Sequence, residues 1–197
     1  MSARGRALVL AGLALGLAAA VAAPAQEVSV SFAAGGFFPS SETVRGIYGS
    51  GPALSADVWF RLKGPIGFAA GFGRVTDKGL AVAAGGGTAS YPLEFRRTTV
   101  PVLVFYRIVA GPADLRLGAG LGFHAYRETW TTAGLDFKGR QAAPRFALTA
   151  SVKIAGRISA FGAAYYESVR TGEGTALDVN VDVGGLQVLG GLSVRIF

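Results

Sequence analysis

The chain offers few residue types that could carry out acid–base or nucleophilic chemistry. His124 is the one histidine among 197 residues, and cysteine is absent. A lipid-modifying enzyme would need that histidine as a base, together with a hydroxyl nucleophile and an orienting carboxylate within hydrogen-bond reach. Ser151 and Asp57 supply these residue types, but no spacing in the sequence brings them to His124. We therefore predict no catalytic site and interpret His124 as an interior histidine with satisfied hydrogen bonds.

Metal and phosphate sites have no better support. A zinc site needs several His, Cys or carboxylate ligands at regular spacing, whereas here one histidine stands among scattered carboxylates. The triple glycine at 85–87 lacks the Gly-Lys-Ser/Thr that completes a phosphate-binding loop, so we interpret it as a loop tip. Gly118, Gly120 and Gly122 alternate by two, which suits one face of a strand and does not match a dinucleotide fingerprint. No cofactor or metal is expected.

Strands are the elements that must position these residues. Between Leu115 and Ala125 every second residue is apolar, and the residues between them are charged, glycine or histidine. A period of two is typical of a strand whose two faces meet different environments. About eight such segments follow one another after residue 26. We expect strands over residues 27–37, 53–63, 66–75, 95–108, 114–125, 144–154, 157–167 and 178–197.

The connections between these strands alternate in length. Short turns are expected near 64–65, 110–113 and 155–156, and longer loops over 38–52, 76–94, 127–143 and around 170–175. In an outer-membrane barrel the short turns face the periplasm and the long loops face outside, which would also put both termini on the periplasmic side. Two irregularities are predicted. Pro101 marks a bulge or a local break in pairing, and the apolar phase shift at Gly184-Gly185 indicates a β-bulge.

The first 25 residues have the pattern of a cleavable signal peptide. Arg4 and Arg6 form a basic start, residues 7–23 are uncharged and mostly apolar, and Ala23-Pro24-Ala25 supplies small residues at the cleavage site. The alternative is a membrane anchor helix, but seventeen residues is marginal for a hydrocarbon layer about 30 Å thick. We predict cleavage after Ala25 and one barrel domain over residues 26–197.

Composition narrows the class of protein further. Removing Arg4 and Arg6 with the signal peptide lowers the net charge from +7 to about +5, and the remaining charges are scattered singly. The chain therefore lacks the basic patch that nucleic-acid binding requires. Hydrophobic residues make up 51% of the chain and charged residues 16%, which is unusually apolar for an exported soluble domain. No stretch after residue 26 has the pattern of a spanning helix.

Alternation alone does not say which face is outside, because a soluble lipocalin-type barrel alternates too. The apolar stripes of strands 53–63, 114–125 and 144–154 carry no charge, and a Lys or Arg facing lipid at the midplane costs about 2–4 kcal/mol. The opposite face mixes small residues with single charges, as a crowded interior would. We predict an interior polar network whose members pair with one another: Asp57, Arg61, Arg116, His124, Arg145 and Lys153, with Glu167 and Arg195 as further candidates.

The chain resembles the small eight-stranded outer-membrane β-barrels of the OmpA, OmpX and OmpW type. The resemblance covers residues 26–197 and rests on residues 116–123, which are similar to that family's fifth strand, and on residues 190–197, which are similar to its terminal strand. It implies an assembly signal read by the barrel-assembly machinery, with Phe197 as its aromatic end. The residues of this signal are Leu192, Val194, Ile196 and Phe197. The first three are out of phase with Phe197, unlike the usual signal.

Aromatic residues near the strand ends are expected to form interfacial girdles: Phe37, Phe38, Tyr48, Phe105, Tyr106, Tyr126, Trp130, Tyr165 and Tyr166. A second aromatic group, Tyr91, Trp130 and Phe137, could grip a ligand. Arg127, Lys138 and Arg140 could meet lipopolysaccharide phosphates, and a solvated loop face is the alternative for them.

The fold class expected is an all-β, eight-stranded, antiparallel up-and-down transmembrane barrel in the outer membrane of a Gram-negative-type bacterium. The leading hypothesis for function is a non-enzymatic protein with a structural or surface-interaction role through four outer loops. The alternatives are a narrow pore or hydrophobic-ligand conduit like OmpW and, with less support, a periplasmic lipocalin-like binding module. Expected partners are outer-membrane lipids, lipopolysaccharide and the assembly machinery, and a monomer is expected.

Overall fold

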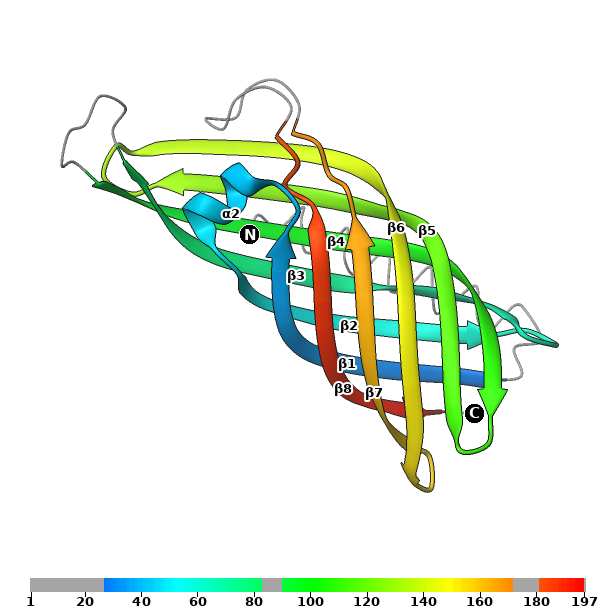
Figure 1. Ribbon diagram of the computed structural model, residues 1–197. Helices are drawn as coiled ribbons and strands as arrows, with labels where there is room; N and C mark the ends of the chain where they lie inside the picture. The colour runs from blue at the N-terminus through cyan, green and yellow to red at the C-terminus, as the bar shows by residue number, and fades with distance from the viewer. Residues whose placement is uncertain (1–26, 83–89, 172–180, 197) are drawn as a thin grey trace.

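The computed structural model describes residues 27–82, 90–171 and 181–196, and its strands form a closed antiparallel barrel (Figure 1). Each strand pairs with its neighbour in sequence, and the first pairs with the last. The elements are β1 (Glu27–Pro39), α2 (Glu42–Tyr48), β2 (Gly51–Arg61), β3 (Ile66–Val82), β4 (Ser90–Ala110), β5 (Ala113–Trp130), β6 (Leu135–Ala155), β7 (Ile158–Glu167) and β8 (Gly185–Arg195). The predicted eight-stranded up-and-down barrel is confirmed. The predicted signal peptide, residues 1–25, lies outside the described residues and stays a prediction.

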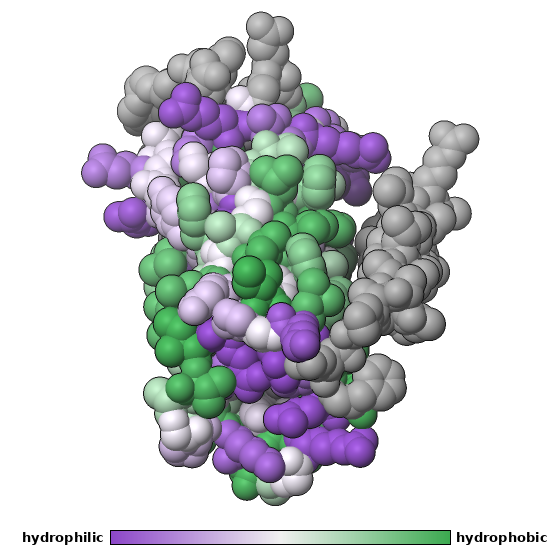
Figure 2. All heavy atoms as spheres, turned by 90° about the vertical axis from the view of Figure 1, so that its right-hand side faces the viewer, coloured by the Kyte–Doolittle hydropathy of each residue, from purple (hydrophilic) through white to green (hydrophobic). Residues whose placement is uncertain are grey.

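The two faces of the strands differ as the alternation predicted. Leu117, Leu121 and Leu148 point outward and are 45–47% exposed, whereas Arg145 and Thr149, from the other phase of β6, are buried inside. Figure 2 shows apolar side chains across the middle of one face, with hydrophilic side chains gathered toward both ends. The apolar stripe therefore faces outward, and the charged and small residues are enclosed.

Four strands extend far beyond their predicted ends. Pairing of β3 with β4 continues to Val82 and Ser90, and pairing of β5 with β6 continues to Trp130 and Leu135. The predicted loops 76–94 and 127–143 are therefore wrong for most of their length. The reason is that outward residues of this extension, such as Lys78, are charged and exposed. Hydropathy alternates only where the outward residues contact an apolar medium. The strands continue beyond that region, so alternation underestimates their length.

The start of the last strand also differs from the prediction. We expected a strand over 178–197 with a bulge at Gly184-Gly185, but β8 begins at Gly185 and its outward residues keep one phase from Leu186 to Ile196. Val183 belongs to the segment before β8, where it is buried over the lumen. The shift in apolar phase at Gly184-Gly185 therefore marks the start of β8 and not a bulge within it. The register shift that the described strands do contain lies between Lys153 and Ala155.

Pro101 interrupts one ladder and leaves the other intact. It pairs with Gly122 on the β5 side, whereas the β3 ladder stops at Ala70↔Val102 and resumes in the same register at Gly73↔Thr99. Because proline has no N–H to donate, pairing is lost locally without an inserted residue. The predicted local break is confirmed, and the alternative of a bulge is not.

The helix α2 lies within a segment that the sequence indicated as a loop. Ser41 caps it, since its Oγ accepts a hydrogen bond from the Val44 amide at 3.5 Å. Arg45 donates to the Pro39 carbonyl at 3.0 Å, which ties the helix to the end of β1. A seven-residue helix has too few turns to show a periodic pattern. Within the described ranges, no helix has the length and hydropathy needed to cross a membrane.

Candidate functional site

The lumen holds two clusters of charged side chains, one toward each end of the barrel. We call the end with turns 62–65, 111–112 and 156–157 the short-turn end, and the opposite end the long-loop end. The Glu167 cluster, toward the long-loop end, consists of Arg97, His124, Arg145, Glu167 and Gln187. The Glu27 cluster, at the short-turn end, consists of Glu27, Arg61, Arg107, Asp114, Arg116 and Arg195. An apolar layer that includes Ala33, Trp59, Phe105, Phe161 and Leu189 separates them.

The Glu167 cluster is fully enclosed. Glu167 Oε1 lies 2.6 Å from Arg97 Nη2, and its Oε2 lies 2.6 Å from Arg145 Nη1. Gln187 donates to Oε1 at 3.0 Å. The three charged side chains are 0–2% exposed. Each arginine also stacks on an aromatic ring, with Arg97 over Phe37 at 4.6 Å, a contact that suits a desolvated guanidinium. The carboxylate and both arginines are therefore paired, as buried charges must be.

His124 belongs to the same cluster, as an interior histidine. Its Nδ1 lies 3.0 Å from Thr99 Oγ1, and its Nε2 lies 3.7 Å from Glu167 Oε2. A hydroxyl, an imidazole and a carboxylate do meet here, but they are not the Ser151 and Asp57 that the sequence offered. The Thr99 hydroxyl is buried, and two arginines contact the Glu167 carboxylate. His124 Nδ1 is hydrogen-bonded, whereas its buried Nε2 has no hydrogen-bond partner among the described residues, so the predicted satisfied histidine is only partly confirmed.

An apolar cover lies above the Glu167 cluster. Val44 and Tyr48 of α2 pack with Phe95, Tyr126 and Val183. The Tyr48 and Phe95 rings are 5.5 Å apart, and burial raises the pKa of the Tyr48 hydroxyl. Figure 1 shows α2 at the long-loop end of the barrel, between β1 and β2. Charged pairing and apolar cover together close this part of the lumen.

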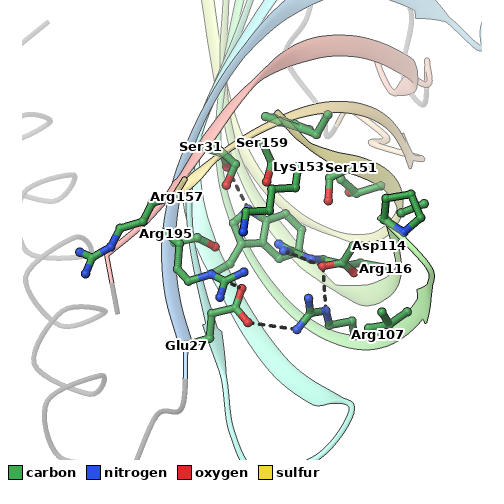
Figure 3. Close-up of a pocket in the computed structure, with 18 of the residues that line it drawn as sticks. Glu27, Ser31, Arg107, Asp114, Arg116, Ser151, Lys153, Arg157, Ser159 and Arg195 are labelled. Atoms are coloured by element: carbon green, nitrogen blue, oxygen red, sulfur yellow. Dashed lines mark hydrogen bonds and ion pairs between the residues drawn. The ribbon is translucent and has the colours of Figure 1, made fainter. Parts of the chain in front are cut away.

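The Glu27 cluster is more open. Arg107 bridges two carboxylates, with Nη1 at 3.0 Å from Glu27 and Nε at 2.7 Å from Asp114. Arg61 approaches Glu27 at 3.2 Å, and Arg195 approaches it at 3.5 Å with a side chain that is 50% exposed. Arg107 and Arg195 line a cavity of about 380 Å³ that opens at the short-turn end (Figure 3). This cavity is the hollow of the lumen that could hold a ligand.

The single interior network predicted from sequence is divided by the structure. Arg61 and Arg116 lie in the Glu27 cluster, and His124 and Arg145 lie in the Glu167 cluster. Asp57 is buried between them, and its Oδ2 accepts from the Tyr165 hydroxyl at 3.5 Å. Lys153 lines the cavity, and no carboxylate of the described ranges lies within ion-pair distance of it.

Sequence reasoning missed five members of these clusters: Glu27, Arg97, Arg107, Asp114 and Gln187. Arg97 and Arg107 share the phase of Leu103 and Phe105, which point inward. This shared phase was the signal in the sequence that could have identified both arginines as inward-facing. Both faces of β4 are apolar near residues 102–105, so the sequence did not show which phase is inside.

The aromatic residues divide differently from the prediction. Phe38, Tyr106 and Tyr166 point outward and are exposed, as girdle residues should be. The girdle prediction is wrong for five others, which are buried in the lumen or its cover: Phe37, Tyr48, Phe105, Tyr126 and Tyr165. Trp130 is half-buried, and its ring lies 6.2 Å from that of Tyr91.

Two further sets of predicted residues lie at the ends of the barrel. Arg127 and Lys138 both contact Asp136 at 2.7 Å on the exposed face of the long-loop end. Leu192, Val194 and Ile196 are exposed on the outer face near the end of β8. Phe197 lies outside the described residues. Among the described side chains, no group of three or more histidines and carboxylates could hold a metal ion.

No family model matches the sequence, and no curated protein matches it either. Solved structures do match. OprG, an outer membrane protein of Pseudomonas aeruginosa, aligns with 12% identity over 88% of this chain and 97% of its own, at a TM-score of 0.63. Neisserial surface protein A aligns with 15% identity over 85% and 96%, at a TM-score of 0.55. Ail, the attachment invasion locus protein of Yersinia pestis, solved with the heparin analogue sucrose octasulfate, aligns with 11% identity over 86% and 97%, at a TM-score of 0.53. The chain has the fold of the small eight-stranded outer-membrane β-barrels.

Proposed function

We propose that this protein resides in the outer membrane as a closed, non-enzymatic barrel with a structural or surface-interaction role. The apolar outward face supports the location, because exposed side chains such as Phe32, Leu117 and Phe146 form a belt too large for a soluble monomer. The lumen holds a charged cluster on each side of one apolar layer, whereas a lipocalin-like module would have a mainly apolar interior. Closure of the sheet leaves no strand edge unpaired in lipid.

The observation that carries the proposed role is the enclosed Glu167 cluster. Its side chains span the lumen from β4, β6, β7 and β8, and α2 and Val183 lie above them. A solute crossing the barrel would have to separate ion pairs that are shielded from water. The lumen therefore blocks the diffusion of solutes. Partners would bind at the surfaces of the two ends of the barrel.

The long-loop end is the proposed contact surface. The extended strands β3 to β6 carry exposed charges there, and Arg127, Lys138 and Arg140 exceed the single Asp136 that pairs with the first two. This surplus supports contact with lipopolysaccharide phosphates, as does the Ail complex with a sulfated sugar. We also retain the proposals of a monomer, of removal of residues 1–25, and of assembly through the terminal strand.

Membrane fractionation and planar-bilayer recording test this function together. We expect the protein to be extracted from membranes by detergent only, to shift on a heat-modifiability gel, and to give no reproducible openings. Regular single-channel openings would contradict the closed lumen and favour the alternative of a narrow pore. Release by osmotic shock without detergent would favour the periplasmic binding module instead. Replacing His124 with Ala should leave the lipid A mass spectrum unchanged.

A further inference from the structure

We propose that the cavity at the short-turn end is a binding site for a phosphate-bearing anion. This inference goes beyond the proposed function and does not depend on which side of the membrane the cavity faces. The walls are built by β1, β2, β4, β5, β6, β7 and β8, whose inward side chains converge on one space (Figure 3). At roughly 30 Å³ for each water in the liquid, 380 Å³ is room for about a dozen waters. A phosphorylated solute of the size of a glycerol phosphate would fit.

The charge of the cavity selects an anion. Five cationic residues line it, against the two carboxylates Glu27 and Asp114; because Arg157 points away from the cavity, the inward side chains carry a net charge of +2. The cations are Arg107, Arg116, Lys153, Arg157 and Arg195. A recess lined by one sign of charge between low-dielectric walls concentrates ions of the opposite sign.

Both carboxylates are already committed. Glu27 accepts from Arg61 and Arg107, and Asp114 contacts Arg107 and Arg116. Because both carboxylates are paired in this way, the positive charge that is not neutralised lies on Lys153 and Arg195. Lys153 has no ion pair within the described part of the chain, and Arg195 reaches Glu27 only at 3.5 Å. Figure 3 shows both side chains pointing into the cavity, whereas Arg157 points away from it.

Hydroxyl groups complete the site. Ser151 and Ser159 line the cavity beside Lys153, on strands β6 and β7, and Ser29 and Ser193 line it from β1 and β8. Phosphate presents several oxygen acceptors around one centre and binds arginine through two parallel hydrogen bonds. Two cations on separate strands with hydroxyl donors between them match that chemistry better than they match a single carboxylate. The phosphate could belong to a free ester or to a lipid headgroup reaching over the rim.

Trp59 gives the test a reporter. It lines the cavity, and the Arg116 guanidinium lies over its ring at 5.1 Å. The other tryptophan, Trp130, is at the long-loop end, so a Trp130→Phe background leaves Trp59 as the source of fluorescence. In protein purified from membranes into neutral detergent micelles, at constant ionic strength, pyrophosphate and glycerol 3-phosphate should each change Trp59 emission saturably. Acetate at the same concentrations should not.

Two double variants that remove the same charge distinguish binding at this cavity from nonspecific electrostatic attraction to the protein. Lys153→Gln with Arg195→Gln should raise the dissociation constant for pyrophosphate at least tenfold. Lys138→Gln with Arg140→Gln, which removes the same charge at the opposite end, should leave it within twofold. If the double variant fails its heat-modifiability check, Lys153→Gln alone should still fold, because Lys153 forms no ion pair with a described carboxylate, and it should weaken binding at least threefold by removing one cation from the site.

Each outcome of the titrations either supports or overturns the phosphate site. Saturation by the soluble phosphates supports a free ester as ligand. Saturation only by phosphatidylglycerol added to the micelles, and again weakened by the cavity variants, supports the same phosphate site with a lipid headgroup in it. Absence of saturation with every phosphate compound, equal weakening by the two double variants, or equal binding of acetate would each overturn the proposal.

Discussion

The two clusters in the lumen use the same chemistry in different surroundings. Each has a glutamate held by at least two arginines, at 2.6 Å in the Glu167 cluster and at 3.0–3.5 Å in the Glu27 cluster. The arginines of the first are 0–2% exposed, and those of the second are 11–50% exposed. In the enclosed cluster, one carboxylate contacts both arginines, and all three side chains are shielded from water. In the open cluster, a cavity and surplus positive charge remain. Burial, and not residue type, therefore decides whether such a cluster closes a barrel or receives a ligand.

The largest expected effect comes from breaking the enclosed cluster. Glu167→Gln leaves two buried guanidinium groups without their counter-charge, which should lower the free energy of unfolding by about 3–5 kcal/mol. Urea unfolding in micelles, followed by tryptophan fluorescence and by the folded and unfolded gel bands, measures this loss. A loss below about 1 kcal/mol would show that water reaches the cluster.

A triple replacement isolates the cause of that loss. Arg97→Met, Arg145→Met and Glu167→Leu together remove every charge and keep similar volume, so stability should return to within about 1–2 kcal/mol of the parent. If the triple variant is as unstable as Glu167→Gln, packing and not unpaired charge explains the first result.

The close approach of β1 and β8 beside the apolar layer gives the next effect. Gly191 faces inward with Ala33 and Phe161 as register partners, and an added Cβ would collide with the Phe32 carbonyl oxygen. Gly191→Ala should therefore cost about 1–3 kcal/mol of unfolding free energy, as overpacking does. The matched control is its neighbour Gly190, where an added Cβ would meet nothing closer than 4.0 Å. Equal unfolding free energies for the two alanine variants would mean that β1 and β8 separate easily enough to admit the added methyl group.

The open cluster should tolerate the same substitution that disrupts the enclosed one. Glu27→Gln removes a carboxylate whose arginine partners are partly solvated, and ion pairs of this kind contribute about 1 kcal/mol or less. The expected change in unfolding free energy is therefore several times smaller than for Glu167→Gln, measured in the same urea titration. A loss as large as that of Glu167→Gln would contradict the distinction between the two clusters.

The smallest effect concerns an ion pair outside the lumen. Hydrogen bonds from Arg127 and Lys138 lower the pKa of Asp136 to about 2, at the exposed long-loop end. The stabilisation from this carboxylate is present above its ordinary pKa of about 3.9 and is lost as the pH falls through about 2. Carboxyl NMR should show this low midpoint, and Arg127→Gln with Lys138→Gln should return it toward the ordinary value. An unchanged midpoint would mean that the pairs do not form in solution.

The sequence predicted the barrel well because lipid-facing strands must alternate, and Leu117, Leu121 and Leu148 kept that pattern. It predicted the lengths of β3 to β6 poorly, because outside the apolar belt the outward residues become charged while pairing continues. The membership of the two charged clusters was even harder to predict from the sequence. Which inward charges meet depends on the stagger between strands, and alternation within one strand carries no information about it. Arg145 and Glu167 are register partners on β6 and β7, a fact that only the register supplies.

Thiol accessibility tests the central contrast most directly, because the natural chain has no cysteine. Ser151 lines the open cavity, and Thr99 contacts His124 in the enclosed cluster, and both point into the lumen. In folded protein, a charged, water-soluble thiol reagent should modify Ser151→Cys at least a hundredfold faster than Thr99→Cys, with equal rates after unfolding in urea. Comparable rates in the folded state would show that water reaches the Glu167 cluster, and the account of a barrel closed by that cluster would be wrong.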